Sequence, residues 1–333
     1  MHRIAVLGAG SWGTALAIHL GHLGHHVTLW ARDASLVEDL RIRRANAVYL
    51  PDSMLPAAVV PTASLAQALD AVSLVVVAVP SHGLRDVVRA AATSLTGETP
   101  VVSTTKGLEE GSLLRMSEVI AGECGPRHPV AVLSGPTFAS EVARQLPTAV
   151  LVASADPDTS RFVQQEFRGP SFRLYASDDV VGVEVGAAMK NIIAIAAGVV
   201  ESLGLGHNAL SALITRGLTE MSRLALALGG RRETLAGLSG LGDLVLTCTG
   251  ALSRNRRLGI ELGRGRPLAE IVAGMKMVAE GVRTTHAALA LGARMGVELP
   301  ITAKMEEVLT TGKSPRVAVG ELMDRPQRAE AEL

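Results

Sequence analysis

The sequence predicts an α/β protein in which a doubly wound N-terminal sheet is followed by an all-helical C-terminal domain. Short, continuous apolar runs alternate with helical stretches up to about residue 178, which is typical of parallel strands covered by helices on both faces. Beyond that residue long helical patterns dominate and strand patterns nearly vanish. A chain of 333 residues has room for about two domains. We therefore expect one domain over residues 1–178, a helical domain over 179–323 and a polar tail over 324–333.

Strands of the first domain are expected where apolar, β-branched runs are bounded by turn residues or proline. These runs cover residues 4–7, 27–31, 74–79, 101–104, 130–133 and 149–153. A helix from about residue 13 to residue 23 separates the first two runs. In the second domain the helical patterns cover residues 180–203, 209–228, 254–263, 268–274 and 284–295.

The composition excludes several classes of function. The 32 basic and 32 acidic side chains cancel, so there is no excess charge to bind nucleic acid or an anionic membrane over a broad face. Two cysteines cannot form a disulfide framework, and no Cys/His cluster has the spacing of metal ligands. The N-terminus lacks a signal-peptide pattern, and the longest apolar segment is interrupted by Glu184, Lys190 and Asn191. We expect a soluble, cytoplasmic protein with no membrane span, no nucleic-acid partner and no metal.

A glycine-rich turn follows the first expected strand. Gly8, Gly10 and Gly13 have the G-x-G-x-x-G spacing and open an expected helix, which is the context of a Rossmann-like dinucleotide site. Gly8 permits the tight turn, Gly10 lets the backbone approach a pyrophosphate, and Gly13 lets the helix pack closely on the sheet. The helix N-terminus offers N–H groups and a positive dipole end to the phosphates. An ordinary glycine-rich turn is the alternative.

The end of the second expected strand bears on the choice of cofactor. Sites for NAD usually have Asp or Glu there to bind the ribose hydroxyls. This chain has Arg32, which can pair with a 2′-phosphate or stack on adenine. We predict that NADP(H) binds, and that NAD(H) is also accepted because Asp33 is adjacent. A solvated arginine at a strand end is the simpler alternative.

Lys190 is a lysine in an apolar helical segment and needs a chemical reason. Only five of the 32 basic residues are lysines, so solvated cations in this chain are mostly arginines. Lysine is required where a cation must lose its proton, because arginine stays protonated in proteins. Burial among the small and apolar residues 186–198 would lower the pKa of Lys190 toward that of a proton acceptor. A lysine that reaches from the helix surface into solvent fits the local pattern equally well.

Other segments place polar groups at strand ends or helix starts. Lys106 follows an expected strand, at the end where open α/β sheets bind ligands. The turn 134–139 has amides that could bind a polar ligand, and the basic helix start 253–257 has the donors of a phosphate clamp. Asp243 lies in a glycine-rich turn between apolar runs. A solvated basic helix start and a plain turn aspartate are the competing explanations.

Longer motifs extend across nearly the whole chain. They are GAGSWGTALA (8–17), STTKGLE (103–109), LSGPTFASEV (133–142), EVGAAMKNIIAIAAG (184–198), NALSALITRGLTEMSR (208–223), LSGLGDLVLTC (238–248), LSRNRRLG (252–259), VAEGVRT (278–284) and GVELPI (296–301). In these motifs the chain resembles the bacterial-type NAD(P)-dependent glycerol-3-phosphate dehydrogenases. Two departures are Thr137, where serine is common, and Gly206-His207-Asn208, where Gly-Asp-Asn is common.

The resemblance implies an enzyme that interconverts sn-glycerol 3-phosphate and dihydroxyacetone phosphate and supplies glycerol 3-phosphate for phospholipid synthesis. It implies that Lys190, in the MKN motif, is the proton acceptor. The matching substrate-contacting positions are Lys106, Gly135, Thr137, Lys190, Asp243, Ser253, Arg254 and Asn255. The matching cofactor-contacting positions, besides the three glycines, are Ser11, Trp12, Arg32, Tyr49, Lys106, Ala139, Arg254, Val278 and Glu280.

The residues themselves suit this chemistry. Oxidation of a secondary alcohol needs a base for the hydroxyl proton, and a neutral Lys190 can accept it. A nearby Lys106 would lower the pKa of Lys190 and a nearby Asp243 would raise it, which leaves the net direction open. A Rossmann-plus-helical reductase of a carboxylate substrate and a non-catalytic nicotinamide sensor are the other candidates. The long helices of the second domain offer a surface for a homodimer.

Overall fold

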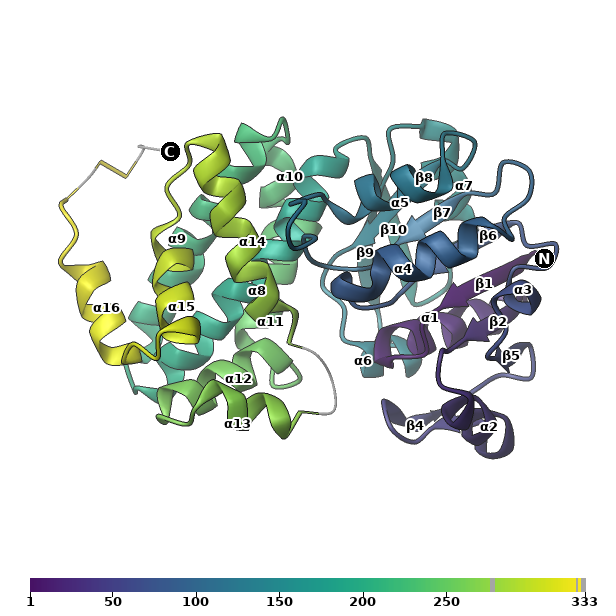
Figure 1. The fold of residues 1–333 in the computed structure, drawn as a ribbon, viewed down its shortest axis with the longest axis horizontal. Helices are drawn as coiled ribbons and strands as arrows, with labels where there is room; N and C mark the ends of the chain where they lie inside the picture. The colour runs from purple at the N-terminus through teal and green to yellow at the C-terminus, as the bar shows by residue number, and fades with distance from the viewer. Residues whose placement is uncertain (276–278, 328, 331–333) are drawn as a thin grey trace. The chain divides into compact units, whose positions relative to one another are not determined.

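The computed structural model describes residues 1–275, 279–327 and 329–330, and the chain divides into two compact units. The first unit consists of Met1–Thr105 and Met116–Val180, and the second of Lys106–Arg115 and Val181–Leu333. The sheet belongs to the first unit, and the second is built of helices (Figure 1). The predicted fold class, a Rossmann-like sheet domain followed by a helical domain, is therefore confirmed.

An eight-stranded sheet forms the centre of the first unit, in the order β10-β9-β8-β7-β6-β1-β2-β5 among the described residues. Its strands are β1 (Arg3–Leu7), β2 (His26–Trp30), β5 (Val59–Thr62), β6 (Leu74–Val77), β7 (Val101–Ser103), β8 (Val130–Ser134), β9 (Thr148–Ala153) and β10 (Phe172–Ser177). The central strands β1 and β6 are covered on both faces, so successive residues, Ile4 with Ala5 and Leu74 with Val75, are all buried. This is why they read as continuous apolar runs.

Helices and a short ribbon complete the first unit. The helices are α1 (Ser11–His22), α2 (Ala34–Arg43), α3 (Leu65–Ala68), α4 (Ser81–Ala92), α5 (Met116–Cys124), α6 (Ala139–Ala143) and α7 (Pro157–Phe167). The antiparallel ribbon joins β3 (Ala45–Asn46) to β4 (Leu50–Met54). The core of this unit includes Leu16 and Leu20 of α1 and Phe167 of α7, none of which is exposed.

The direction of sheet building changes at β1. This strand pairs with β2 on one side and with β6 on the other, and both pairings are parallel. Ligands of open α/β sheets bind outside the carboxyl ends of the strands at such a switch point. Gly8 directly follows β1 there: its N–H donates to the carbonyl of Trp30 at 2.9 Å, and the N–H of Ala78 donates to the carbonyl of Leu7 at 2.8 Å. The glycine-rich turn therefore lies where this fold places a ligand.

The sheet differs from the expected one in two ways. One pair of neighbouring strands is antiparallel, and the two edge strands lack a continuous apolar pattern. The pairing of β8 with β9 is antiparallel, so β9 and β10 run opposite to the other strands. Strand β5 contains Pro61, which an edge strand tolerates because one side of it needs no partner. In β10 polar and apolar residues alternate from Phe172 to Tyr175, with the apolar ones buried. Neither edge strand has the continuous apolar pattern on which the strand prediction rested.

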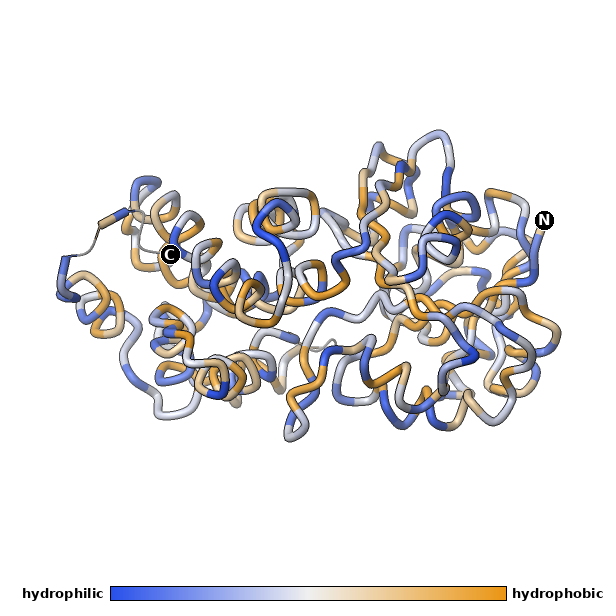
Figure 2. Tube along the Cα trace, turned by 90° about the horizontal axis from the view of Figure 1, so that it is seen from above, coloured by the Kyte–Doolittle hydropathy of each residue, from blue (hydrophilic) through white to orange (hydrophobic). Residues whose placement is uncertain are grey.

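The second unit is organised around one buried helix, α8 (Val180–Ser202). Every residue from Gly182 to Val200 is buried. The other elements are α9 (Gly206–Ala227), α10 (Arg232–Ala236), the π-helical turn η1 (Leu238–Gly242), α11 (Asp243–Thr249), α12 (Arg254–Gly263), α13 (Leu268–Ala273), α14 (Glu280–Met295), α15 (Pro300–Thr310) and α16 (Pro315–Met323). Figure 2 shows hydrophobic and hydrophilic residues alternating along many of the helices, as expected where one face packs in a core.

Helix α8 is long and apolar enough to cross a membrane, alone among the described helices, and this bears on the predicted absence of a span. Of its most apolar 18-residue window, 89% is buried inside the protein. The apolar surface of α8 is therefore covered by other parts of the protein. The burial is that of a core helix.

The segment Lys106–Arg115 shows that the two units are not separated by a single boundary in the sequence. We expected it inside the first domain, but it packs with the helical unit. Its Leu108 is 2% exposed and belongs to the helical core. A short excursion of the chain, residues 106–115, thus leaves the first unit and joins the second, and Lys106 is its first residue.

Candidate active site

Lys190 lies on α8 inside the helical core, and its side chain is 6% exposed. Glycines let neighbouring backbones approach this helix closely. A Cβ at Gly198 would lie 2.0 Å from the carbonyl oxygen of Arg256, and one at Gly259 would lie 1.9 Å from that of Ile195. The alternative of a lysine that reaches from the helix surface into solvent is therefore wrong.

Lys190 contacts a buried carboxylate that a second lysine shares. Its Nζ donates to Oδ1 of Asp243 at 2.5 Å and to Oγ1 of Thr247 at 2.8 Å. The other carboxylate oxygen, Oδ2, accepts a hydrogen bond from Nζ of Lys106 at 2.7 Å. We call Lys106, Lys190, Asp243 and Thr247 the lysine–aspartate cluster. Its carboxylate bridges two ammonium groups, and all four residues belong to the second unit.

Burial is the main influence on the pKa of Lys190. It lowers the pKa of the Lys190 ammonium from its ordinary value to about 7. The Asp243 carboxylate opposes this decrease and the Lys106 ammonium adds to it, but burial is the largest contribution. The question that the sequence left open is thus answered in favour of a lowered pKa. Near neutral pH the amine can exist both with and without its proton, as an acid–base catalyst requires.

A π-helical turn places Asp243 in the core. Asp243 is the first residue of α11 and follows η1 directly, and it is fully buried. A Cβ at Gly240, within this turn, would lie 2.0 Å from the carbonyl oxygen of Leu235, so the backbone path requires glycine there. Single π-helical turns are uncommon and occur often at functional sites. Asp243 is therefore not a plain solvated turn residue.

The start of α12 is connected to the neighbours of Lys190. Ser253 caps the helix through its side chain, as its position predicted. Asn255 donates through Nδ2 to Oδ1 of Asn191 at 2.9 Å, and its Oδ1 accepts from the N–H of Gly281 at 3.2 Å. Arg254 is exposed at the same helix start. A helix start with a hydroxyl and a guanidinium could bind an anion within the second unit.

The glycine-rich turn has the geometry of a pyrophosphate cradle. Gly8 has a φ of +117°, in the region that favours glycine. A Cβ at Gly13 would lie 1.8 Å from the carbonyl oxygen of Gly8, whereas one at Gly10 would meet nothing within 4 Å. No side chain caps α1 at Gly10, and Nε1 of Trp12 is buried without a hydrogen-bond partner among the described residues. The turn fits a dinucleotide because the backbone face at Gly10 is open and no side chain caps the start of α1 there.

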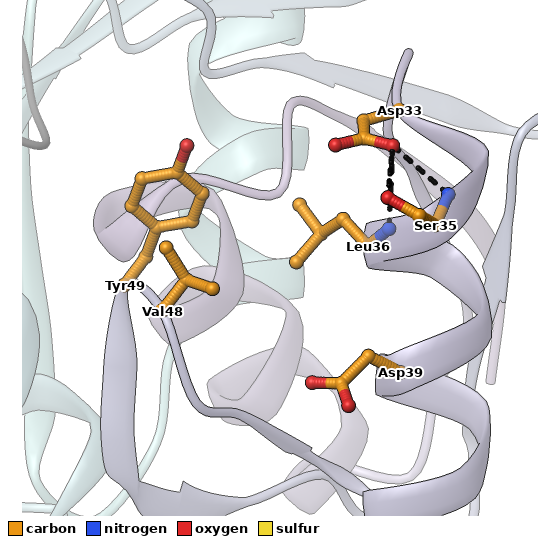
Figure 3. A pocket seen from close by; sticks show the side chains of 6 residues that line it. All are labelled: Asp33, Ser35, Leu36, Asp39, Val48 and Tyr49. Carbon is orange, nitrogen blue, oxygen red and sulfur yellow. Dashed lines mark hydrogen bonds between the residues drawn. The ribbon is translucent and has the colours of Figure 1, made fainter.

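A pocket of about 220 Å³ lies beyond the end of β2, within the first unit (Figure 3). It is lined by Asp33, Ser35, Leu36, Asp39, Val48 and Tyr49. Asp33 caps α2: its carboxylate accepts the N–H groups of Ser35 at 2.9 Å and Leu36 at 3.4 Å. The hydroxyl of Ser35 contributes most to lowering the pKa of Asp33, and these two N–H groups add to it. Arg32 is exposed beside it, and Oγ of Ser11 donates to the carbonyl of Tyr49 at 2.7 Å, which ties this wall to the glycine-rich turn.

The remaining predicted residues divide between the units. Gly135, Thr137 and Ala139 lie at the turn from β8 to α6 in the first unit, where Oγ1 of Thr137 donates to the carbonyl of Gly135 at 3.2 Å. Glu280 begins α14 in the second unit, and Val278 lies outside the described residues. Thr247 and Asn191 were not predicted.

A pattern in the sequence could have indicated each of these two. Thr247 is one helical turn after Asp243, and Asn191 directly follows Lys190. The first spacing places a hydroxyl beside the carboxylate. The second brings an amide to the same part of α8.

Comparison with known proteins agrees with this geometry. Residues 3–160 match the family described as NAD-dependent glycerol-3-phosphate dehydrogenase N-terminus, and residues 179–320 match the corresponding C-terminus. A protein of Koribacter versatilis named glycerol-3-phosphate dehydrogenase (NAD(P)+) is 53% identical over 337 aligned residues, which cover 100% of both chains. The chain belongs to this family. The resemblance predicted from the sequence motifs is confirmed.

Two further family members support the assignment. A protein of the same name from Moorella thermoacetica is 50% identical over 329 residues, covering 99% of this chain and 98% of its own. The crystal structure of glycerol-3-phosphate dehydrogenase from Coxiella burnetii is 42% identical, with a TM-score of 0.94, and the match covers 97% of this chain and 99% of that one. The family match therefore extends to both units.

Proposed function

We propose that this family member is an NAD(P)-dependent sn-glycerol-3-phosphate dehydrogenase that interconverts glycerol 3-phosphate and dihydroxyacetone phosphate. The observation that carries the proposal is the buried Lys190, whose pKa of about 7 suits a group that takes and returns a proton. The names of the full-length relatives support it. In the cell the reaction would supply glycerol 3-phosphate for phospholipid synthesis.

The proposed proton transfer centres on Lys190. In the oxidising direction its neutral amine accepts the proton of the secondary hydroxyl, and in the reducing direction its ammonium returns a proton to the alkoxide oxygen. A bound nicotinamide supplies the hydride acceptor or donor. Asp243 and Thr247 hold Nζ of Lys190 in place through hydrogen bonds of 2.5 and 2.8 Å. A lysine held in this way loses little freedom when substrate arrives.

Lys106 adds a second role to the cluster. Its ammonium is 18% exposed, more than Lys190 or Asp243, and so can reach a ligand while it remains paired with Asp243. We propose that it binds the substrate oxygens and stabilises the negative charge that develops on the carbonyl oxygen during reduction. It also counts among the positions that match cofactor contacts in the family.

The start of α12 would hold the substrate phosphate. Ser253, Arg254 and Asn255 present a hydroxyl, a guanidinium and an amide there. Fixing the phosphate fixes the distance of the reacting carbon from Lys190, because Asn255 is bonded to Asn191 on α8. We propose Gly135 and Thr137 as further substrate contacts.

NADP(H) and NAD(H) are the proposed cofactors. Gly8, Gly10 and Gly13 with Ser11 and Trp12 would receive the pyrophosphate. Arg32 and Tyr49 would bind the adenosine end, and Arg32 would pair with a 2′-phosphate. The exposed guanidinium of Arg32 at the end of β2 supports NADP(H) over NAD(H). Ala139, Arg254, Val278 and Glu280 complete the proposed cofactor set.

Three coarser features remain part of the proposal. We propose that residues 1–178, apart from the 106–115 excursion, form the dinucleotide-binding domain, that 179–323 form the substrate and catalytic domain, and that 324–333 form a tail, with some contacts to each ligand from the other domain. We also propose a cytoplasmic location and a homodimer formed through the helical unit. Light scattering at several protein concentrations tests the dimer: a mass near 34.6 kDa throughout would contradict it.

One assay tests the proposed function against its rivals. Absorbance of NADPH is followed with dihydroxyacetone phosphate, then with 2-keto acids, then without substrate. We expect rapid oxidation only with dihydroxyacetone phosphate. Oxidation with a 2-keto acid alone would indicate a carboxylate reductase, and binding of NADPH without any turnover would indicate a sensor.

A further inference from the structure

Residues 106–115 form a compact hairpin, which we call the Lys106 hairpin. Leu108 and Arg115 pair as an antiparallel bridge. Inside that bridge the N–H of Glu109 donates to the carbonyl of Leu114 at 2.9 Å. Arg115 therefore lies directly opposite Leu108, and Leu108 is only two residues after Lys106 in the sequence. The bridge therefore couples the two arms of the hairpin.

Apolar and ionic contacts fasten the hairpin to the helical unit. Leu108 is buried in the helical core, and Leu113 packs against it. Nη1 of Arg115 contacts Oε2 of Glu184 at 2.7 Å, with side chains that are 16% and 3% exposed. A second ion pair on the hairpin, Glu110 with Arg283 at 3.2 Å, is nearly half exposed on both sides and hence more strongly screened by solvent.

The contacts close a ring through the lysine–aspartate cluster. Glu184 and Lys190 are both on α8, six residues or about 9 Å apart along the axis. From Glu184 the ring passes through Arg115 and its bridge to Leu108, and then to Lys106. From Lys106 it returns to Lys190 through the two oxygens of Asp243. One side of this ring is a helix, so the position of Lys106 is fixed from both ends.

We propose that the Arg115–Glu184 ion pair is a positioning device that holds Lys106 on the Asp243 carboxylate beside Lys190. This inference rests on the proposed dehydrogenase function, because it assigns the pair a task in the acid–base step. Arg115 and Glu184 act through Lys106. Neither was among the residues expected to contact substrate or cofactor.

A displaced Lys106 would change the proton affinity of Lys190. The charged or titratable groups that face Lys190, among the described residues, are Asp243, Lys106 and the thiol of Cys248. Burial raises the pKa of the Cys248 thiol to about 12, so it stays neutral in the working range. Lys106 lowers the pKa of Lys190 and Asp243 raises it. Loss of Lys106 from its place leaves the carboxylate to act alone, and the pKa of Lys190 rises.

The principal test replaces both members of the pair, Arg115→Met with Glu184→Leu. Apolar residues at both positions avoid an unpaired buried charge, which would destabilise the fold. The pH dependence of kcat for glycerol 3-phosphate oxidation is measured on the full chain with saturating NADP+. We expect the midpoint of its acid limb to move to higher pH by roughly half a unit or more, with KM for NADP+ unchanged. The matched control, Arg283→Met with Glu110→Leu, breaks the exposed pair on the same hairpin and should keep the wild-type midpoint.

A second readout does not depend on turnover. Lys106 is labelled with an amine-reactive reagent, and its rate of modification relative to Lys304 is followed by mass spectrometry. We expect the double variant to raise this ratio about threefold or more, since Lys106 would spend more time away from Asp243. If the wild type shows no dehydrogenase activity, the proposed function fails while this labelling test still judges the positioning role.

A conservative variant covers the case in which the double variant does not fold. Arg115→Lys keeps the charge but loses the planar guanidinium that fits a carboxylate. We expect a smaller shift of the acid limb in the same direction, with a wild-type circular dichroism spectrum. A folded variant of either kind with unchanged pH profile and unchanged Lys106 labelling would overturn the proposal.

Discussion

The glycine-rich turn and the lysine–aspartate cluster would recognise their proposed ligands by opposite means. At the turn the proposed ligand contacts are made by the backbone, and Gly8, Gly10 and Gly13 contribute through the absence of side chains. In the cluster the working parts are side-chain charges that burial has taken out of water. A site built from backbone is sensitive to added side-chain atoms, because these clash with neighbouring backbone. A buried-charge site depends on the chemistry of each group, so the two should fail in different ways.

Lys190→Ala should produce the largest effect on turnover. Removal of the proton acceptor should lower kcat by about 10³- to 10⁴-fold in both directions, because water must replace a positioned base. The Kd for NADPH, measured by fluorescence titration, should stay within about twofold of wild type. Lys304→Ala, in an ion-pair cluster between α15 and α16, is the control and should keep its activity. Near-normal turnover of the Lys190 variant would remove the residue from its role.

Gly13→Ala should weaken cofactor binding and leave the proton acceptor unchanged, the opposite of what Lys190→Ala should do. The new Cβ would meet the carbonyl oxygen of Gly8 at 1.8 Å, so the turn must open. We expect the Kd for NADPH to rise about tenfold or more, while the pKa of Lys190 is unchanged. Gly122→Ala places a methyl group in open space on α5 and serves as the control. Equal cofactor affinity in the two variants would contradict the cradle.

Arg254→Ala should weaken the phosphate site and leave the proton acceptor intact. We expect KM for dihydroxyacetone phosphate to rise by about one to two orders of magnitude, from the loss of a charge-assisted contact. Arg257→Ala, an exposed arginine on the same helix, is the matched control. A normal KM in the Arg254 variant would exclude it from the clamp.

Arg32→Ala should have the smallest effect and should alter only cofactor preference. Loss of a guanidinium that pairs with the 2′-phosphate should raise KM for NADPH several-fold and leave KM for NADH nearly constant, about 1 kcal/mol of discrimination. Arg127→Ala, an exposed arginine elsewhere in the first unit, controls for net charge. An unchanged ratio of the two constants would discard the assignment.

The fold was largely predictable from the sequence because its core elements carry strong patterns. Strands β1, β2, β6, β7, β8 and β9 were expected from continuous apolar runs, since both faces of the sheet are covered. The edge strand β10 was missed because its alternating pattern reflects cover on one face only. Short helices such as α10 and α11 were missed because fewer than two turns cannot establish a helical period.

The site was predictable to a smaller extent. The scarcity of lysine singled out Lys190, and the motif spacing singled out the glycine-rich turn. Nothing local indicated that Asp243 bridges two lysines, because that contact joins three segments far apart in sequence. The hairpin contact between Arg115 and Glu184 is likewise a product of packing. Whether burial or Asp243 controls the pKa of Lys190 required the surroundings in three dimensions.

A titration of the lysine side chains by NMR tests the central claim most directly. With only five lysines in the chain, labelling of lysine at the ε-carbon gives few signals, and Lys190→Ala identifies the one from Lys190. We predict that this signal titrates near pH 7, because burial lowers its pKa, and that Lys106→Met raises its midpoint by removing a neighbouring cation. A Lys190 signal that titrates near the ordinary lysine value of about 10.4 would contradict the account.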